Sequence, residues 1–145
     1  MCVLTLGGEL FAIDLRHVGE VFEVESVTAV PSMPSYLTGV TNLRGTVITL
    51  VDLRGSLGLP AGQTSLPFAV VIRYGPRQIG VLVDHVPEIH TVAREQLLPA
   101  MQAGPVGARP CVSAVLRVDQ RLGGVLEVPQ VFAQVDGGSA AFPVM

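Results

Sequence analysis

The sequence contains no lysine, and all nine of its basic residues are arginines. Charge is scarce in general, because charged residues make up 14% of the chain, against about 25% in an average globular protein. Hydrophobic residues reach 49%, and the mean hydropathy is +0.54. We therefore expect apolar surface to remain after the core is filled, and such surface marks contact sites for partners. Arginine suits these contacts because its planar fork binds oxygen atoms with fixed geometry. The net charge of −3 argues against nucleic acid as a partner.

Signals for export, membrane insertion and metal binding are also missing. The chain has no basic start followed by an apolar segment, and no apolar run of about 20 residues. Cys2 and Cys111 are far apart in sequence, which favours buried free thiols in a reducing compartment over a metal-binding pair. His17, His85 and His90 lack a cluster of further ligands. We expect a cytoplasmic protein that does not insert into a membrane and holds no metal.

Residues 39–54 form the most informative stretch and predict a β-hairpin. Residues 47–51 are a β-branched run, typical of a strand. Arg44 and Gly45 supply the turn, since glycine readily takes a positive φ. The tip carries Asn42 and Arg44 beside apolar strands. The polar side chains of this stretch are therefore expected at the hairpin tip, where the two strands hold them in position.

The rest of the chain reads as short strands separated by turns. A second hairpin is predicted over residues 112–118 and 122–128, around Asp119 and Gln120. We also expect a helical turn over residues 16–21, a strand over 22–30 and a helical turn over 129–135 anchored by Val131 and Phe132. Residues 97–110 are rich in proline and glycine and predict the longest loop. Residues 136–145 predict a flexible tail.

An internal repeat is visible in the sequence. Residues 11–31 match residues 79–99 without a gap, so that Val18 corresponds to Val86, 68 positions later. Residues 37–53 match residues 112–128, 75 positions later, so the second copy carries seven extra residues in the Pro/Gly loop. Many short strands in two copies favour two small antiparallel barrels. Such a pair creates a groove where the lobes meet, and junctions of this kind are common binding sites.

The sequence resembles the CheW-like domain family, the adaptors that couple bacterial chemoreceptors to their histidine kinase. The most specific feature is Asn42-Leu43-Arg44-Gly45 joined through an apolar run to Asp52-Leu53-Arg54. Further matching features occur in the family's order across nearly the whole chain: Phe11-Ala12-Ile13, Val18, Glu20-Val21, Val30-Pro31, Gly39-Val40, residues 47–51, residues 80–84 and Val86.

The resemblance implies a mainly β fold of two SH3-like five-stranded barrels on a shared apolar core, forming one domain over residues 1–145. It implies no enzymatic activity and no cofactor. The implied partners are the cytoplasmic tip of a chemoreceptor (a methyl-accepting chemotaxis protein) and a CheA-type histidine kinase. By matching position, Asn42, Arg44 and Thr46 lie near the receptor site, with Val24 and Val27 as apolar neighbours. The kinase-facing residues can be placed only loosely, on the other lobe.

Other interpretations stay open at this point. Arg44 at a hairpin tip is often only a solvated turn residue, and Asn42 often only satisfies the turn backbone. Asp52 and Arg54 favour a structural pair over a functional one. The chain has no recognisable nucleophile with an adjacent base and no phosphate-binding glycine loop, so a ligand-binding or enzymatic β-barrel is the weaker hypothesis. The Pro/Gly loop leaves open whether the adaptor serves chemotaxis or another array, such as one controlling pili.

Overall fold

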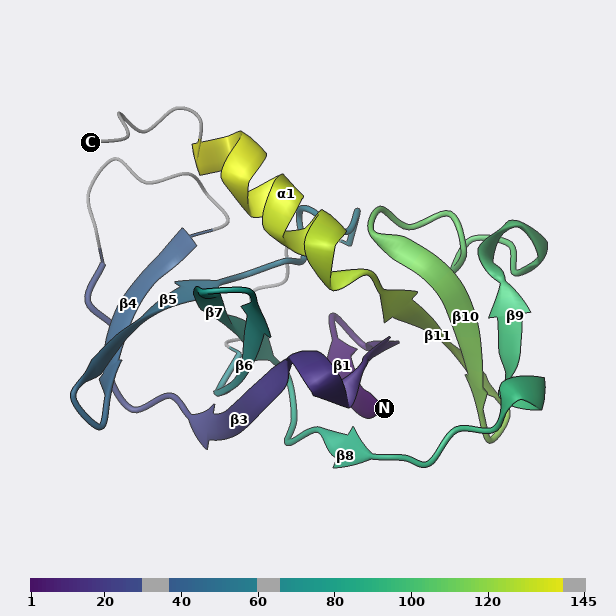
Figure 1. Cartoon of the computed structure of the whole chain (residues 1–145), viewed down its shortest axis with the longest axis horizontal. Coiled ribbons are helices and arrows are strands. Elements are labelled where there is room, and N and C mark those ends of the chain that lie inside the picture. Colours follow the sequence, from purple (N-terminus) through teal and green to yellow (C-terminus); the bar gives the residue numbers. More distant parts are fainter. Residues whose placement is uncertain (30–36, 60–65, 140–145) are drawn as a thin grey trace.

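The computed structural model of the chain describes residues 1–29, 37–59 and 66–139. Within these ranges the chain is mainly β, as predicted, and its elements are shown in Figure 1. The strands are β1 (Cys2–Leu6), β2 (Glu9–Ile13), β3 (Val18–Glu23), β4 (Leu37–Leu43), β5 (Thr46–Val51), β6 (Phe68–Tyr74), β7 (Arg77–Val83), β8 (Glu88–Ile89), β9 (Leu97–Pro99), β10 (Val112–Val118) and β11 (Arg121–Leu126). Short 3-10 helices occur at η1 (Leu15–His17), η2 (Arg94–Gln96) and η3 (Ala100–Gln102), and one α-helix, α1, spans Val128–Ser139.

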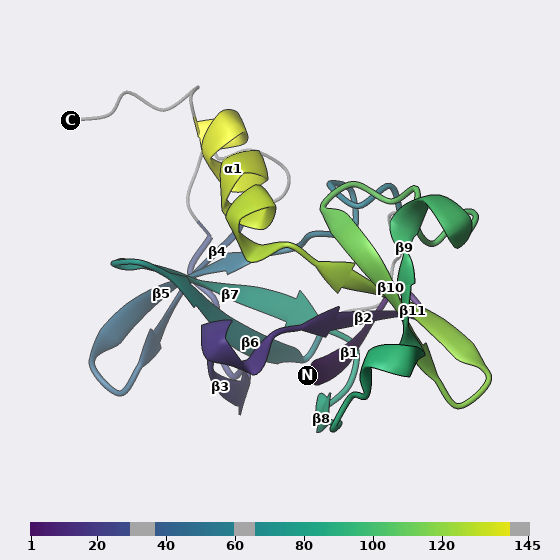
Figure 2. The same cartoon turned by 45° about the vertical axis from the view of Figure 1, so that its right-hand side comes forward.

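The strands form two sheets that lie side by side along the long axis of the molecule (Figure 1). The six-stranded sheet has the order β8-β1-β2-β11-β10-β9, and the five-stranded sheet has the order β3-β6-β7-β5-β4. Figure 2 shows that the hairpin of β4 and β5 and the hairpin of β10 and β11 extend to opposite ends of the molecule. Helix α1 runs across the top of both views and begins where β11 ends.

The offsets found in the sequence recur in the register of the sheets. Cys2 pairs with Ile13 in the first hairpin, and Val70 pairs with Val81 in the hairpin 68 residues later. A β-bulge lies between residues 37 and 39, and another lies between residues 112 and 114, 75 positions later. The hairpin β1–β2 joins β11, whereas β6–β7 joins β3 and β5. Each sheet is therefore completed by a hairpin from the other copy.

Each sheet curves so that its own two edge strands come close to each other. Thr28, which follows β3, exchanges two backbone hydrogen bonds with Val40 of β4, at 2.8 and 2.9 Å. Because β3 and β4 are opposite edges of the five-stranded sheet, this bridge draws the sheet round on itself. In the six-stranded sheet a single stretch, residues 88–99, supplies both edge strands. The curvature agrees with the barrel-like lobes expected from the sequence.

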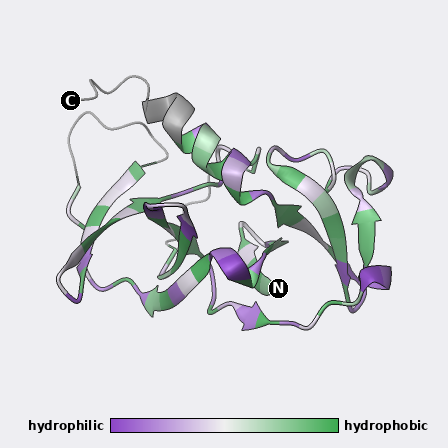
Figure 3. Cartoon of the chain, viewed as in Figure 1, coloured by the Kyte–Doolittle hydropathy of each residue, from purple (hydrophilic) through white to green (hydrophobic). Residues whose placement is uncertain are grey.

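The buried hydrophobic side chains form two clusters, of which the larger joins the two sheets. The larger cluster combines residues from both sheets with Phe132 of α1, and the smaller one lies within the six-stranded sheet. Successive residues of a strand point to opposite faces, so β2 places Phe11 in the larger cluster and Leu10 and Ala12 in the smaller one. Figure 3 shows the hydrophobic colour on large parts of the strands, and the hydrophilic colour on part of η1 and on part of β8.

Some predicted elements are placed differently in the structure. Strand β3 begins at Val18, where a helical turn was predicted, because residues 18–23 pair with the distant strand β6. Residues 24–29 carry only the isolated bridge at Thr28, and residue 30 lies outside the described residues. The second hairpin is confirmed, with Asp119 at φ 54°, but its second strand ends at Leu126. Residues 97–110 are not loop throughout, since β9 and η3 occupy their first part.

The C-terminal helix is longer than the turn predicted over residues 129–135. Val128, Val131, Phe132 and Val135 are buried at spacings of three or four residues, which forms one apolar stripe on a helix. Once the first turns of a helix have formed, extending it by one residue costs little free energy. Accordingly, α1 continues over residues 136–139, where a flexible tail was predicted. Residues 140–145 lie outside the described part of the chain.

None of the helices in the described ranges has both the length and the apolar character required to cross a bilayer.

Candidate functional site

The predicted hairpin tip forms between β4 and β5. Arg44 has φ 51° and Gly45 has φ 86°, and two successive positive φ values are those of a type I′ turn, the favoured two-residue hairpin loop. The side-chain oxygen Oδ1 of Asn42 accepts a hydrogen bond of 2.8 Å from the backbone N–H of Gly45. Asn42 therefore does stabilise the turn, which was one of the two interpretations of this residue.

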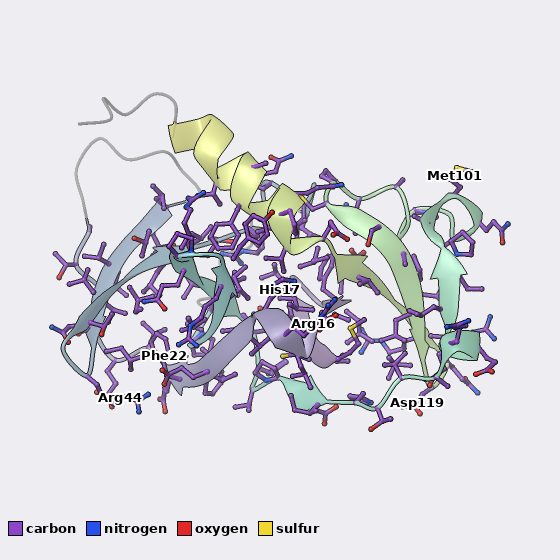
Figure 4. The ribbon with its side chains drawn as sticks, in the orientation of Figure 1. Arg16, His17, Phe22, Arg44, Met101 and Asp119 are labelled. Carbon is purple, nitrogen blue, oxygen red and sulfur yellow. The ribbon has the colours of Figure 1, made fainter. Side chains whose placement is uncertain are left out.

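The guanidinium of Arg44 forms an ion pair with the carboxylate of Glu20 on β3. The Arg44 side chain is 72% exposed and that of Glu20 is 34% exposed, so the cation is held in place while most of its surface faces solvent. Figure 4 places Arg44 at one end of the molecule, beyond Phe22 of β3. Sequence reasoning missed this pairing, because the two residues are 24 positions apart and only their place in a closed sheet brings them together.

Two shallow hollows flank the hairpin tip. The first has a volume of about 140 Å³ and is lined by Glu20, Leu43, Arg44, Thr46, Ile48, Val71, Arg73 and Gln78. The second has a volume of about 320 Å³ and is lined by Phe22, Glu23, Glu25, Ser26, Thr41, Asn42 and Leu43. The predicted receptor residues are thus divided, with Arg44 and Thr46 at the first hollow and Asn42 at the second.

Val24 and Val27 lie apart from the tip and are not among the residues lining these two hollows. Val24 is half-buried and packs against the larger core cluster. Val27 is 40% exposed and lies beside Gly39, next to the bridge between Thr28 and Val40. Of the two valines, Val27 offers more apolar surface to a partner.

A third hollow, of about 430 Å³, lies where the two sheets are linked. It is lined by Met1, Asp14, Leu15, Ile89, His90, Thr91, Val92 and Leu97. Leu15 belongs to η1, which connects β2 of the six-stranded sheet to β3 of the five-stranded sheet. Leu15, Ile89 and Leu97 are among the large apolar side chains left exposed. This is apolar surface of the kind that the composition predicted.

Asp52 and Arg54 form a structural pair after β5. The guanidinium nitrogen Nη2 of Arg54 lies 2.8 Å from Oδ2 of Asp52, and the backbone N–H of Arg54 donates to Oδ1 of the same carboxylate at 3.0 Å. Hydrogen bonding to Asp52 raises the pKa of Arg54. Asp14 and Arg16 repeat this arrangement at η1, with Nη2 of Arg16 2.9 Å from Oδ2 of Asp14. Both aspartates hold backbone turns in place, which is a framework role.

The histidines are placed separately. The ring atom Nδ1 of His17 lies 3.2 Å from the backbone oxygen of Arg73, and Nε2 of His90 lies 3.2 Å from Oε1 of Glu88. In the part of the chain that the structure describes, no three His, Cys, Asp or Glu side chains gather as metal ligands would. His17 also packs edge-on against Tyr74, with ring centroids 6.4 Å apart.

Comparison with known proteins shows which family and which solved structure the chain is similar to. A family model described as "CheW-like domain" matches residues 1–136. The chain is 30% identical to the "Probable chemotaxis protein CheW" of Rhizobium etli over 136 residues, covering 93% of this chain and 88% of that protein. It is 36% identical to "Protein PilI" of Pseudomonas aeruginosa over 82 residues, covering 56% of this chain and 46% of that protein. The structure of the scaffolding protein TtCheW from Thermoanaerobacter tengcongensis superposes with a TM-score of 0.73 at 25% identity, covering 87% of this chain and 86% of that one.

Proposed function

The chain belongs to the CheW-like domain family, and we propose that it is a non-catalytic adaptor that bridges a chemoreceptor and a CheA-type histidine kinase in the cytoplasm. The mechanism is geometric: a rigid body of two intertwined lobes fixes the spacing and orientation of both partners, so that the state of the receptor reaches the kinase. The relatives named as chemotaxis proteins and the solved scaffolding protein support this role.

The observation that carries the proposal is the exposed guanidinium of Arg44, held by Glu20 at the end of the molecule. A side chain that is already held in place loses less conformational entropy on binding than a freely rotating one. Arginine is also enriched among the residues that dominate binding energy in interfaces. We assign Arg44, Thr46 and Asn42 to the receptor-binding surface, with Val27 and Val24 as apolar neighbours.

The test is to measure binding of a purified cytoplasmic receptor fragment to the wild type and to the Arg44→Glu variant by fluorescence anisotropy. We expect Arg44→Glu to abolish binding while the melting temperature changes little. The double variant Arg44→Glu with Glu20→Arg restores an ion pair with its charges exchanged, and we expect it to remain unable to bind. Undiminished binding by Arg44→Glu, with an intact fold by circular dichroism, would refute the assignment.

The bridging role requires both partners to bind at the same time. We expect the chain to co-sediment with the receptor fragment and the kinase together, and the amount of kinase recovered with the receptor to fall when the chain is left out. We place the kinase on the six-stranded lobe, away from Arg44, because a bridge needs two separate surfaces. Competition between kinase and receptor for the chain would argue against this arrangement.

The similarity to PilI favours a second candidate within the same class, an adaptor in an array that controls pili. Co-purification from the source cells distinguishes the two, because the receptors and kinases recovered differ between the arrays. A small-ligand-binding or enzymatic barrel is the remaining alternative. A large and specific thermal shift with a metabolite or a metal would favour it.

A further inference from the structure

A second arginine borders the same hollow as Arg44. Arg73 of β6 is exposed and lines the hollow of about 140 Å³ together with Arg44, Thr46 and Gln78. It comes from the second copy of the internal repeat, whereas Arg44 and Thr46 come from the first. Nothing in the sequence pattern linked Arg73 to the hairpin tip, since β6 reaches it only through the exchange of hairpins between the two sheets.

The position of the Arg73 guanidinium depends on a glycine. Gly19 lies in the β-bulge between Val18 and Glu20, and a Cβ atom on residue 19 would stand 2.8 Å from Cζ and 3.0 Å from Nε of Arg73. The guanidinium therefore occupies space that any side chain at position 19 would take. Its Nε atom also donates to Oε1 of Gln78 at 3.4 Å, so the group is directed along the wall of the hollow.

The charges around the hollow define what it accepts. Two guanidinium groups and the carboxylate of Glu20 leave one net positive charge, and Thr46 and Gln78 add a hydroxyl and an amide. A single carboxylate balances this charge and matches guanidinium geometry. A dianionic phosphate would carry excess charge beside Glu20. The small volume also suits the end of one side chain rather than a nucleotide.

We propose that Arg73 and Arg44 together form a binding site for one carboxylate, that of an Asp or Glu side chain of the partner protein. The identity of the partner as a chemoreceptor rests on the proposed function, but the carboxylate site itself does not. In the complex the carboxylate accepts hydrogen bonds from Arg73 and from the exposed edge of Arg44, while Glu20 keeps its contact with Arg44.

The site is tested first with a small probe. Acetyl-Ala-Glu-Ala-amide is titrated into the protein at low salt while the arginine Nε–Hε signals are followed by NMR, with acetyl-Ala-Gln-Ala-amide as the matched control. We expect the signals of Arg73 and Arg44 to shift in a saturable way with the Glu peptide only. An Arg73 signal that stays in place, or moves equally with both peptides, would overturn the proposal.

The second test uses the cytoplasmic receptor fragment. We expect Arg73→Gln to weaken its binding about five- to tenfold, as for loss of one charged hydrogen-bonding group. Arg117→Gln on β10, which removes the same charge in the other sheet, should change affinity less than about twofold. Gly19→Ala keeps the charge but displaces the guanidinium, and we expect it to weaken binding as well.

The two tests separate the inference from the proposed function. If the wild type fails to bind the receptor fragment while the Glu peptide still shifts Arg73, the receptor role fails and the carboxylate site stands. If the fragment binds the wild type, Arg73→Gln and Gly19→Ala equally well while Arg44→Glu abolishes binding, the receptor role stands and the two-arginine site is wrong.

Discussion

Gly39 and Thr28 lie so close in the curved sheet that a Cβ atom on residue 39 would stand 2.4 Å from the backbone oxygen of Thr28. This oxygen accepts the hydrogen bond from Val40 that helps to join the two edges of the five-stranded sheet. Gly39 also has φ 152° and lies at the bulge of β4. Closure of this lobe therefore depends on the absence of a side chain at position 39, five residues before Arg44 at the hairpin tip.

We expect Gly39→Ala to lower the free energy of unfolding by about 2–3 kcal/mol, because the added methyl group collides with backbone that cannot rotate away. Urea denaturation followed by circular dichroism measures the change. Gly55→Ala is the matched control, because a Cβ on residue 55 meets no atom within 4 Å, and we expect it to be neutral. Equal stability of the two variants would show that the close approach is not important.

The two Asp-Leu-Arg sequences predict different costs for the same substitution. The side chain of Arg54 is 11% exposed, whereas that of Arg16 is 81% exposed. We expect Arg54→Met to destabilise the protein by about 1–3 kcal/mol, because it leaves the carboxylate of Asp52 without its shielded cation. Arg16→Met should cost clearly less than Arg54→Met, because an exposed ion pair adds little to stability. Similar losses in urea denaturation would contradict this difference.

Asp14 predicts a pH-dependent contribution to stability. Hydrogen bonds from the side chain and from the backbone of Arg16 hold the pKa of the Asp14 carboxyl below its usual value of 3.8. A lowered pKa in the folded state adds stability above the unfolded pKa, and this stability is lost as the pH falls through the folded value. Because Asp14 is partly exposed, we expect Asp14→Asn to cost under about 1 kcal/mol at pH 7.

The measurement for Asp14 is urea denaturation of the wild type and of Asp14→Asn from pH 7 down to pH 2.5. The difference in unfolding free energy should shrink as the pH falls below about 4, where the carboxyl of the unfolded chain takes up its proton. Asparagine retains a side-chain oxygen that accepts from the backbone of Arg16, so the comparison isolates the charge. A difference that stays constant down to pH 2.5 would exclude the ionised carboxylate as its source.

The cysteines should be unreactive in the folded protein. Cys2 and Cys111 are both buried free thiols, and burial raises the pKa of each. Since the thiolate is the reactive form, we expect both to react with Ellman's reagent at pH 7.5 at least about tenfold more slowly than free cysteine. Both thiols should react rapidly in about 6 M guanidinium chloride, which unfolds all but exceptionally stable domains. If both thiols of the native chain react as fast as free cysteine, they are accessible and this prediction is wrong.

Local signals in the sequence were sufficient for the hairpin tip. Gly45 and the β-branched run of β5 predicted the turn at Arg44 and Gly45, and the structure has it there.

The length of helix α1 was underestimated, because glycines at positions 137 and 138 weaken the local preference for a helix. Burial of Phe132 and Val135 decides its formation instead. Strand β3 was misplaced for a similar reason, since its pairing partner lies about 50 residues away in β6.

By itself, the sequence determined which segments repeat, where the chain turns, and that an asparagine and an arginine stand at a hairpin tip, because these properties depend on neighbouring residues and their spacing. Only the tertiary structure decided that the two copies exchange their first hairpins, and with this exchange that Glu20 and Arg73 border the same hollow as Arg44. The physical reason is that strand pairing across the molecule is selected by the burial of two apolar faces at once, and no local pattern records which hairpin completes which sheet.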